Sequence, residues 1–307
     1  IRFFLWDSQF GRFFNTGPIK GKGDKLFFLH TLLWAFLPWS LIMYAALYSR
    51  IRQGIKKVSA PFTEWFTLCS CLLTLLVFSF SGFQLPHYTN IIFPMLAILS
   101  AVLIDQQVNR GQTVFGKIQN GLVVLLLILV GGLLFFYRPA LSIVFIVTGL
   151  LLLTLLLFLP KFSVVDKQWY PYLRSGIAVL FVAVFLNLCF YPDLLRYQSG
   201  NLAATYMNKQ YPSEALGRLG IYFPSGEFYL HQPTYRSSVD DIRLQKFSKA
   251  RILFVTADEV GELEKAGVAF EKLKSFDEFH VTMLSLKFIN PKTRHKELKQ
   301  HYLIRLL

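Results

Sequence analysis

The chain has 307 residues, of which 54% are hydrophobic and 16% charged, and its mean hydropathy is +0.44. This composition excludes a purely water-soluble protein and indicates a membrane protein with an attached soluble part. The net charge of +14 does not indicate a nucleic-acid partner. The first 192 residues hold 15 of the 32 Lys and Arg residues but only five acidic ones, a bias that the loops of a membrane protein explain.

Six apolar runs are expected to cross a membrane as helices, since one crossing takes about 20 mostly apolar residues. The expected fold is therefore an α-helical polytopic membrane protein with about six transmembrane helices, followed by an external α/β domain. The six runs are Leu26–Tyr48, Phe62–Phe83, Tyr88–Ile104, Gly121–Tyr137, Pro139–Pro160 and Pro171–Tyr191.

Basic residues in the short loops predict the orientation, because such loops remain on the cytoplasmic side. Nine of them fall on one face, which is therefore assigned to the cytoplasm: Arg50, Arg52, Lys56, Lys57, Arg110, Lys117, Lys161, Lys167 and Arg174. The outer face then receives residues 1–25, the loop Gln84–Tyr88, Arg138 and everything after Pro192. We expect a multi-pass protein of the cytoplasmic (inner) membrane whose C-terminal domain is external, or periplasmic.

The first external segment departs from this charge rule. Residues 1–25 carry five basic side chains (Arg2, Arg12, Lys20, Lys22 and Lys25) against Asp7 and Asp24. One interpretation is ordinary scatter in loop charge. The other is that an outward-facing basic and aromatic segment meets an anion at the membrane surface, such as a lipid phosphate.

The composition changes after Asp193, and the pattern predicts a small soluble α/β domain. A helix is expected over residues 196–211 and a second over 257–265, with Gly267 as its stop. Strands are expected at 218–223, 227–231, 251–256, 280–288 and 302–306, with Pro224–Gly226 as a turn. The predicted organisation is thus a basic external loop (1–25), a helical membrane domain (26–192) and an external domain (193–307).

Several familiar chemistries are not supported by the sequence. The stretch Gly17–Asp24 has three residues instead of four before its Gly-Lys pair, and no Ser or Thr follows, so it is not a nucleotide-binding loop. The six histidines are scattered, and His295 and His301 are expected to be solvated. Cysteines occur only in apolar runs, where they are expected to be small buried hydrophobes. No metal and no cofactor is expected.

The stretch Gln84-Leu85-Pro86-His87-Tyr88 lies at the predicted outer boundary, on the same face as the basic first segment. A proline turn with an interfacial tyrosine is one explanation. The other is that Gln84, His87 and Tyr88 present hydrogen-bond donors to an anionic ligand entering from the lipid. Spacing alone favours the first explanation.

Three stretches carry a resemblance to a known family: FFLWDSQFGRFF, GDKLFFLHTLLWAFLPW and FSFSGFQLPHYTNIIFPMLAIL. They resemble the second half of polyprenyl-phosphate-dependent glycosyltransferases of the GT-C fold, in the branch of the lipid A aminoarabinose transferase and its relatives, akin to protein O-mannosyltransferases. The resemblance covers residues 3–104, while 105–192 match in topology alone. It implies that this chain is the C-terminal part of a longer protein.

The resemblance also implies site residues. It places Arg12, of the pair Arg12-Phe13, toward the carrier phosphate, and Leu85, Pro86 and Tyr88 in a loop over the same cavity. Relatives often have lysine where this chain has Gln84, so phosphate neutralisation rests more on Arg12 and on nearby lysines such as Lys20 and Lys22. Arginine suits this task because it is always charged and binds phosphate bidentately. The catalytic base is expected upstream of Ile1.

The predicted function is transfer of a sugar from a polyprenyl-phosphate carrier to a lipid, glycan or protein acceptor on the outer face of the membrane. Its partners would be the carrier-linked sugar, the acceptor and membrane lipids. The alternative is a non-enzymatic membrane protein, such as a flippase component or a sensor with an external ligand-binding domain. The residues leave the sugar and the acceptor open.

Overall fold

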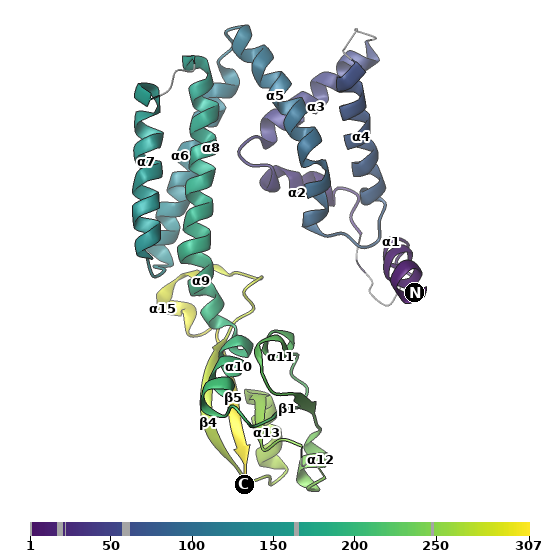
Figure 1. Ribbon diagram of the computed structural model, residues 1–307, viewed down its shortest axis with the longest axis vertical. Coiled ribbons are helices and arrows are strands. Elements are labelled where there is room, and N and C mark those ends of the chain that lie inside the picture. Colours follow the sequence, from purple (N-terminus) through teal and green to yellow (C-terminus); the bar gives the residue numbers. More distant parts are fainter. Residues whose placement is uncertain (1, 17–20, 22, 57–61, 163–165, 247–248) are drawn as a thin grey trace. The chain divides into compact units, whose positions relative to one another are not determined.

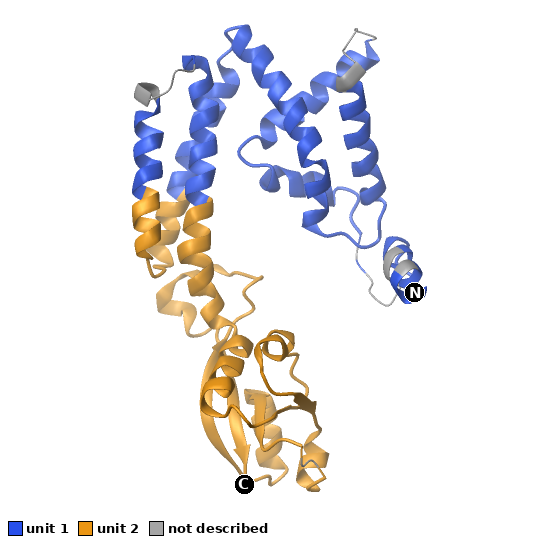
Figure 2. Ribbon diagram, in the orientation of Figure 1, with its two compact units in different colours: residues 1–128, 150–182 blue, residues 129–149, 183–307 orange. Residues whose placement is uncertain are grey.

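The computed structural model describes residues 2–16, 21, 23–56, 62–162, 166–246 and 249–307 (Figure 1). The chain divides into two compact units. The first comprises residues 1–128 and 150–182, and the second comprises 129–149 and 183–307 (Figure 2). Each unit is described by itself below.

The first unit begins with a π-helix, η1 (Phe3–Phe10), which continues into α1 (Gly11–Phe13). Two helices then follow where one membrane span was predicted over Leu26–Tyr48: α2 (Phe27–Ala35) and α3 (Ser40–Ile55). Pro38 lies in the break between them. Because proline lacks the N–H that a helix interior requires, it separates the two segments. The predicted span over Leu26–Tyr48 is therefore not confirmed as one helix.

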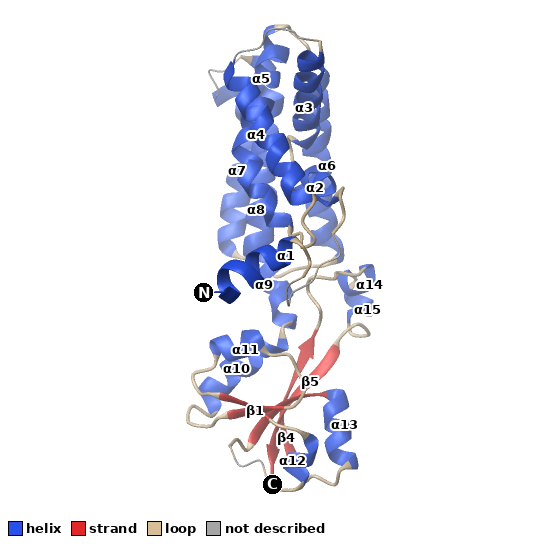
Figure 3. Cartoon of the chain, turned by 90° about the vertical axis from the view of Figure 1, so that its right-hand side faces the viewer, coloured by secondary structure: helices blue, strands red, loops and turns tan. Residues whose placement is uncertain are grey.

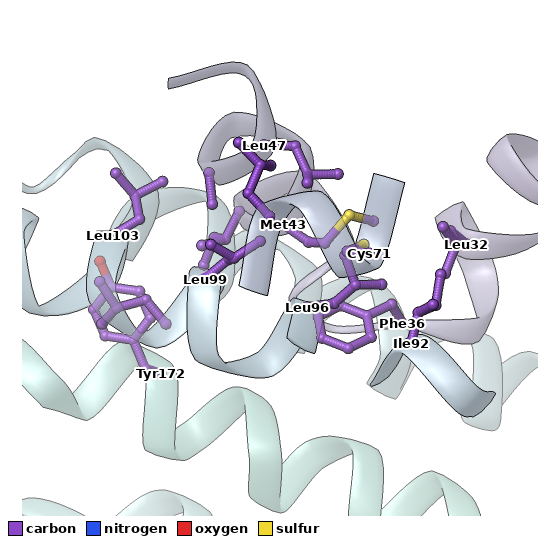
Figure 4. Close-up of a cluster of buried hydrophobic side chains, with 14 of the residues drawn as sticks. Leu32, Phe36, Met43, Leu47, Cys71, Ile92, Leu96, Leu99, Leu103 and Tyr172 are labelled. Atoms are coloured by element: carbon purple, nitrogen blue, oxygen red, sulfur yellow. The ribbon is translucent and has the colours of Figure 1, made fainter. Parts of the chain in front are cut away.

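The helices α4 (Phe62–Ser79) and α5 (Phe93–Asn109) are joined through η2, a 3-10 helix over Pro86–Ile92. Together with α2 and α3 they enclose one apolar core (Figure 4). Its buried members include Leu32, Met43, Cys71, Leu96 and Leu99, each at most 1% exposed. Cys71 confirms the expectation of a small buried cysteine, whereas Cys69 is exposed.

A series of apolar helices follows: α6 (Val114–Phe136), α7 (Ile143–Phe162) and α8 (Tyr170–Phe185). The short η3 (Lys167–Trp169) precedes α8, and η4 (Leu186–Phe190), α9 (Tyr191–Leu194) and η5 (Leu195–Tyr197) extend it.

Within the described ranges, three continuous helices are long and apolar enough to cross a membrane: Pro86–Asn109, Val114–Phe136 and Lys167–Tyr197. The apolar helices Trp65–Ser79 and Ile143–Leu159 are shorter. The structure therefore supports a helical membrane protein but does not confirm six spans.

The second unit contains a mixed five-stranded sheet with strand order β2-β1-β3-β5-β4. Its strands are β1 (Leu216–Arg218), β2 (Thr234–Arg236), β3 (Ile252–Thr256), β4 (Phe270–Glu278) and β5 (Lys299–Leu306). The pairs β1–β2 and β1–β3 are parallel, whereas β3–β5 and β4–β5 are antiparallel.

Helices cover both faces of this sheet, with α10 (Ser199–Gln210) and α11 (Pro224–Tyr229) on one side and α12 (Val239–Arg243) and α13 (Ala257–Lys265) on the other (Figure 3). Successive side chains of β3 point to opposite faces, so Ile252 and Phe254 pack in one core and Leu253 and Val255 in the other. This arrangement explains why β3 is apolar without interruption.

The predicted strand 251–256 and the predicted helix 257–265 are confirmed. Thr256 and Glu259 form a capping box at the start of α13, and Gly267 after its end has φ +73°. Three predicted strands were wrong. Of residues 218–223, only Arg218 belongs to a strand, at the end of β1. Residues 224–229, which include the expected turn, form α11, because Pro224 occupies the first helical turn where its missing N–H costs nothing. Residues 286–289 form α14 and 291–294 form α15.

Two polar clusters hold the second unit together. The Arg294 guanidinium lies 4.3 Å from the Tyr137 ring centroid, and it donates to the carbonyls of Phe288 (2.9 Å) and Tyr137 (3.0 Å) and to the Tyr197 hydroxyl (3.3 Å). In the other cluster, His301 Nδ1 lies 2.7 Å from the Ser199 hydroxyl. That hydroxyl in turn donates to Glu278. His301 is therefore a packed residue with hydrogen-bond partners, and the expectation that it is solvated was wrong.

Candidate functional site

The two segments that the sequence singled out lie against each other in the first unit. The Gly82 N–H donates to the Phe13 carbonyl (2.8 Å). The Asn15 side chain holds Gly21 through hydrogen bonds in both directions (3.0 and 2.9 Å). The described residues 12–16, 21, 23 and 24 and the residues 81–88, called here the paired loops, thus contact one another. Arg12, Gln84, His87 and Tyr88 all belong to them, whereas Lys20 and Lys22 lie outside the described residues.

Glycines permit the close approach of the paired loops. A Cβ on Gly21 would lie 2.6 Å from the Gly82 carbonyl oxygen, and a Cβ on Gly82 would lie 2.7 Å from the Asn15 Cβ. Such distances are shorter than van der Waals contact. Gly21 therefore allows two backbones to come together at this point.

Gln84 joins three parts of the site. Its Nε2 lies 3.3 Å from the Ser79 carbonyl and 3.5 Å from the Phe78 carbonyl, to which it donates, and both belong to the last turn of α4. Its Oε1 accepts from the Asp24 N–H (2.9 Å). The last carbonyls of a helix have no partner within the helix. The Gln84 amide therefore caps α4 and attaches the first loop to it.

Among the described residues of the paired loops, Arg12 is a charged group with unused hydrogen-bonding capacity. Its guanidinium lies 5.5 Å from the Phe83 ring centroid, so the ring supports the cation from one side. The Arg12 Nε is buried and has no hydrogen-bond partner among the described residues. A buried donor left without an acceptor costs about 1–3 kcal/mol, which an acceptor on a ligand would offset.

Tyr88 and His87 lie at the start of η2, which Pro86 begins. The Tyr88 ring packs on Phe78 (centroids 5.5 Å apart) and meets the His87 ring edge-on (4.9 Å). Thr89 donates its hydroxyl to the Pro86 carbonyl (2.8 Å) and fixes this turn. Tyr88 is half-buried and His87 is exposed. The aromatic contacts thus set the direction of the Tyr88 side chain.

An apolar groove of about 560 Å³ begins at Asn90, two residues beyond Tyr88. Along α5 it is lined by Phe93, Ala97, Ser100, Ala101 and Ile104, which share one helical face, and opposite them by Phe36 and Trp39 at the break between α2 and α3. From Phe93 to Ile104 this face of α5 extends about 16 Å along the helix axis. Sequence reasoning missed the groove. Its signals were the prolines Pro38 and Pro94 and the small residues at helical spacing.

A second cavity, of about 520 Å³, lies beside η1 and α1. It is lined mainly by aromatic rings, among them Phe3, Trp6 and Phe10, and it contains the Asp7 side chain. Within the described part of the chain, no group of three His, Cys, Asp or Glu side chains is placed to hold a metal ion.

Comparison with known proteins gives a fold and no sequence family. No protein-family model matches the chain, and no curated protein matches its sequence. Two solved structures do match it. ArnT from Cupriavidus metallidurans bound to undecaprenyl phosphate has a TM-score of 0.64 at 16% identity, over 99% of this chain and 55% of that chain. The apo state of the same protein has a TM-score of 0.56 at 14% identity, over 97% and 56%.

This likeness establishes the fold. The chain has the architecture of a part of ArnT and spans about half the length of those structures. The predicted resemblance to the GT-C glycosyltransferase fold is thereby confirmed, and the match extends beyond residues 3–104 to nearly the whole chain.

Proposed function

We propose that this chain forms part of a membrane glycosyltransferase that uses a sugar donor carried on a polyprenyl phosphate. Two observations carry the proposal: an unsatisfied buried arginine nitrogen in the paired loops, and an apolar groove that begins at Asn90, two residues beyond Tyr88. A polyprenyl phosphate has the matching parts, an anionic head and an apolar tail. ArnT, whose fold the chain shares, has been captured with undecaprenyl phosphate.

In this proposal Arg12 binds the carrier phosphate with its guanidinium, whose planar fork matches two phosphate oxygens. Tyr88 donates its hydroxyl to the same group, and His87 lies at the entrance. Lys20 and Lys22 would add positive charge. Gln84 contributes indirectly, by holding the two loops together through its hydrogen bonds. The tail of the carrier lies along α5 between Phe93 and Ile104.

The reaction breaks the bond between the sugar's anomeric carbon and the phosphate oxygen, and the electron pair remains on that oxygen. A bond then forms from the acceptor oxygen to the anomeric carbon. Arg12 stabilises the charge that grows on the leaving phosphate, which is where preorganised donors contribute most. The proton leaves the acceptor hydroxyl for a carboxylate base that we do not assign to the described residues. Transfer would occur on the outer face of the membrane, to a lipid, glycan or protein.

Binding of separate parts of the carrier tests the proposal. The purified full chain in detergent should bind undecaprenyl phosphate more tightly than undecaprenol, which lacks the phosphate, and more tightly than a short-chain alkyl phosphate, which lacks the tail. Ala97→Trp should fill the groove and reduce the affinity for undecaprenyl phosphate toward that for the short-chain phosphate. Ile98→Trp is the matched control, because Ile98 is exposed and does not line the groove.

Equal affinity for undecaprenol and undecaprenyl phosphate would contradict the assignment of a phosphate site. Equal effects of Ala97→Trp and Ile98→Trp would contradict the assignment of the groove. Binding of undecaprenyl phosphate without sugar transfer by the complete protein would favour the non-enzymatic alternative.

A further inference from the structure

A polar cavity lies in the first unit, where the apolar helices α6 and α8 begin. Its volume is about 300 Å³, and it forms where the loop before α6 meets the segment before α8, within the first unit. Lys117 lines it from α6 and Lys167 from η3, and Gln112, Thr113, Asn120 and Gln168 contribute amide and hydroxyl groups. Two exposed lysines from separate segments thus line one hollow together with neutral hydrogen-bonding side chains.

The charge of this cavity is not compensated within the described part of the chain. None of the residues lining it is acidic, and neither lysine forms an ion pair there. Asp166 precedes Lys167 in the sequence but does not line the cavity. An anion bound in the cavity would meet two basic side chains and no acidic one. The cavity is therefore suited to an anionic group.

The walls of the cavity are fixed by packing. A Cβ on Gly116 would lie 3.2 Å from Pro171 Cγ, so the helices α6 and α8 approach closely at this point. Tyr172 belongs to the buried core of the first unit, and Phe115 and Trp169 pack against that core. The backbone on both sides of the cavity is thus attached to the core, and the two lysine-bearing segments remain together without a ligand.

The position of the cavity identifies the anion. The apolar helix α6 begins at Val114 and α8 begins at Tyr170, so the cavity lies where apolar helices enter a membrane. Trp169, Tyr170 and Tyr172 are aromatic residues of the kind enriched at the headgroup level. The loops that carry Lys117 and Lys167 are on the side that the charge pattern assigns to the cytoplasm, where anionic phospholipids attract basic side chains.

We propose that this cavity, defined by Lys117 and Lys167, binds the phosphate of an anionic phospholipid headgroup in the cytoplasmic leaflet. The site is separate from the paired loops and does not depend on the proposed transferase activity. The lipid would bridge the start of α6 and the start of α8, and its acyl chains would extend along the apolar helices.

The full chain in detergent, titrated with dioctanoyl phosphatidylglycerol, tests this site, with bound lipid counted by native mass spectrometry. Dioctanoyl phosphatidylcholine and inorganic phosphate serve as competing probes. The measurement is made in an Arg12→Ala background, so that lipid bound at the paired loops is not counted. With both lysines present, the protein should bind one molecule of phosphatidylglycerol tightly. Neither phosphatidylcholine nor inorganic phosphate should displace it at the same concentration.

The double variant Lys117→Gln/Lys167→Gln should weaken that equivalent by about thirtyfold, since each lysine near an anionic lipid surface contributes a factor of about five. Lys117→Arg/Lys167→Arg keeps the charge and should keep the binding, which separates loss of charge from loss of fold. Arg110→Gln is the matched control, because it removes a cation from the same loop outside the cavity.

Unchanged affinity in the double Gln variant, or an equal loss in Arg110→Gln, would overturn the proposal. Loss of binding in the double Arg variant would overturn it as well, because charge would then not be the determinant. Displacement by inorganic phosphate at equal concentration would show a site for free phosphate and contradict the lipid assignment.

Discussion

Arg294 and Arg12 each pack against an aromatic ring, and their hydrogen bonds distinguish their roles. Arg294 in the second unit stacks on Tyr137 and donates from its Nε and both terminal nitrogens to groups of the protein. Arg12 in the first unit lies over Phe83 with a buried Nε that has no acceptor in the described part of the chain. Arg294 therefore has a structural role, whereas we propose that the unused buried Nε of Arg12 meets a ligand.

Replacing Arg12 should give the largest effect on ligand binding. Arg12→Ala removes the cation and the bidentate donor, so affinity for undecaprenyl phosphate should fall by at least about a hundredfold, as expected for a charge-assisted pair. The melting temperature should stay within about 1 °C, because the side chain makes no hydrogen bond to the described protein. Arg138→Ala, on the same predicted face and exposed, is the control and should bind as the wild type does. Calorimetric titration measures the affinity of both variants. An Arg12→Ala variant that is destabilised and still binds undecaprenyl phosphate would contradict the difference drawn between Arg12 and Arg294.

Replacing Arg294 should have the opposite outcome. Arg294→Ala leaves the carbonyls of Phe288 and Tyr137 without their donor and removes the stacked cation, so the free energy of unfolding should fall by about 2–3 kcal/mol. Binding of undecaprenyl phosphate at a temperature where the variant is folded should be unchanged. Denaturant unfolding followed by circular dichroism gives the stability. Loss of carrier binding in the folded variant would mean that Arg294 is not confined to a structural role.

Replacing Gln84 should loosen the paired loops without unfolding the chain. Gln84→Ala removes the acceptor of the Asp24 N–H and the cap of α4, so hydrogen exchange at Asp24 should accelerate by about tenfold. Gln84→Lys restores the charge that relatives often have but also lacks the acceptor, and it should accelerate exchange equally. Exchange in α13 serves as the internal reference. If the Asp24 amide stays protected in both variants, Gln84 does not join the loops.

The smallest effect concerns pH and the cluster around His301. Burial lowers the pKa of His301 below its ordinary value of 6.5, the nearby Lys299 also lowers it, and the charges of Glu278 and Glu259 act in the opposite direction. The folded domain therefore binds a proton more weakly than the unfolded chain. Its stability should be complete above pH 6.5 and should decrease as the pH falls toward the lowered pKa.

The variant His301→Asn isolates this contribution, because asparagine does not titrate. Thermal unfolding of the variant between pH 7.5 and 5 should show a shallower decrease in melting temperature than the wild type. A steeper decrease in the variant would show that His301 gains a proton on folding, which is the reverse of the expected linkage.

Some elements could be predicted because their determinants are local. Three features of the second unit are each determined by a few neighbouring residues, and the structure contains all of them. They are the continuous apolar run of β3, the capping box Thr256–Glu259 and Gly267. The strand predicted over residues 227–231 failed because Pro224 starts a helical turn instead of ending a strand. The single span predicted over Leu26–Tyr48 is divided into α2 and α3, because the chain breaks at Pro38.

The site could be predicted only in part, because its connections are long-range. Arg12, His87 and Tyr88 were selected from their residue types and from a family resemblance. Gln84 was taken for a possible ligand of the carrier, and nothing near it in the sequence shows that Asp24, 60 residues away, uses its amide oxygen. The groove along α5 likewise depends on Phe36 and Trp39, which reach it only because the chain breaks at Pro38.

The central claim is that the unused donor of Arg12 meets the carrier phosphate. Solid-state NMR distance measurement between guanidinium ¹⁵N and the ³¹P of bound undecaprenyl phosphate tests it directly, in the full chain with labelled arginine. The wild type should show strong dephasing, as for an N–H···O contact of about 2.8 Å, and Arg12→Lys should lose that signal while Arg138→Lys retains it. Dephasing that persists in Arg12→Lys, or none in the wild type with carrier bound, would contradict the assignment.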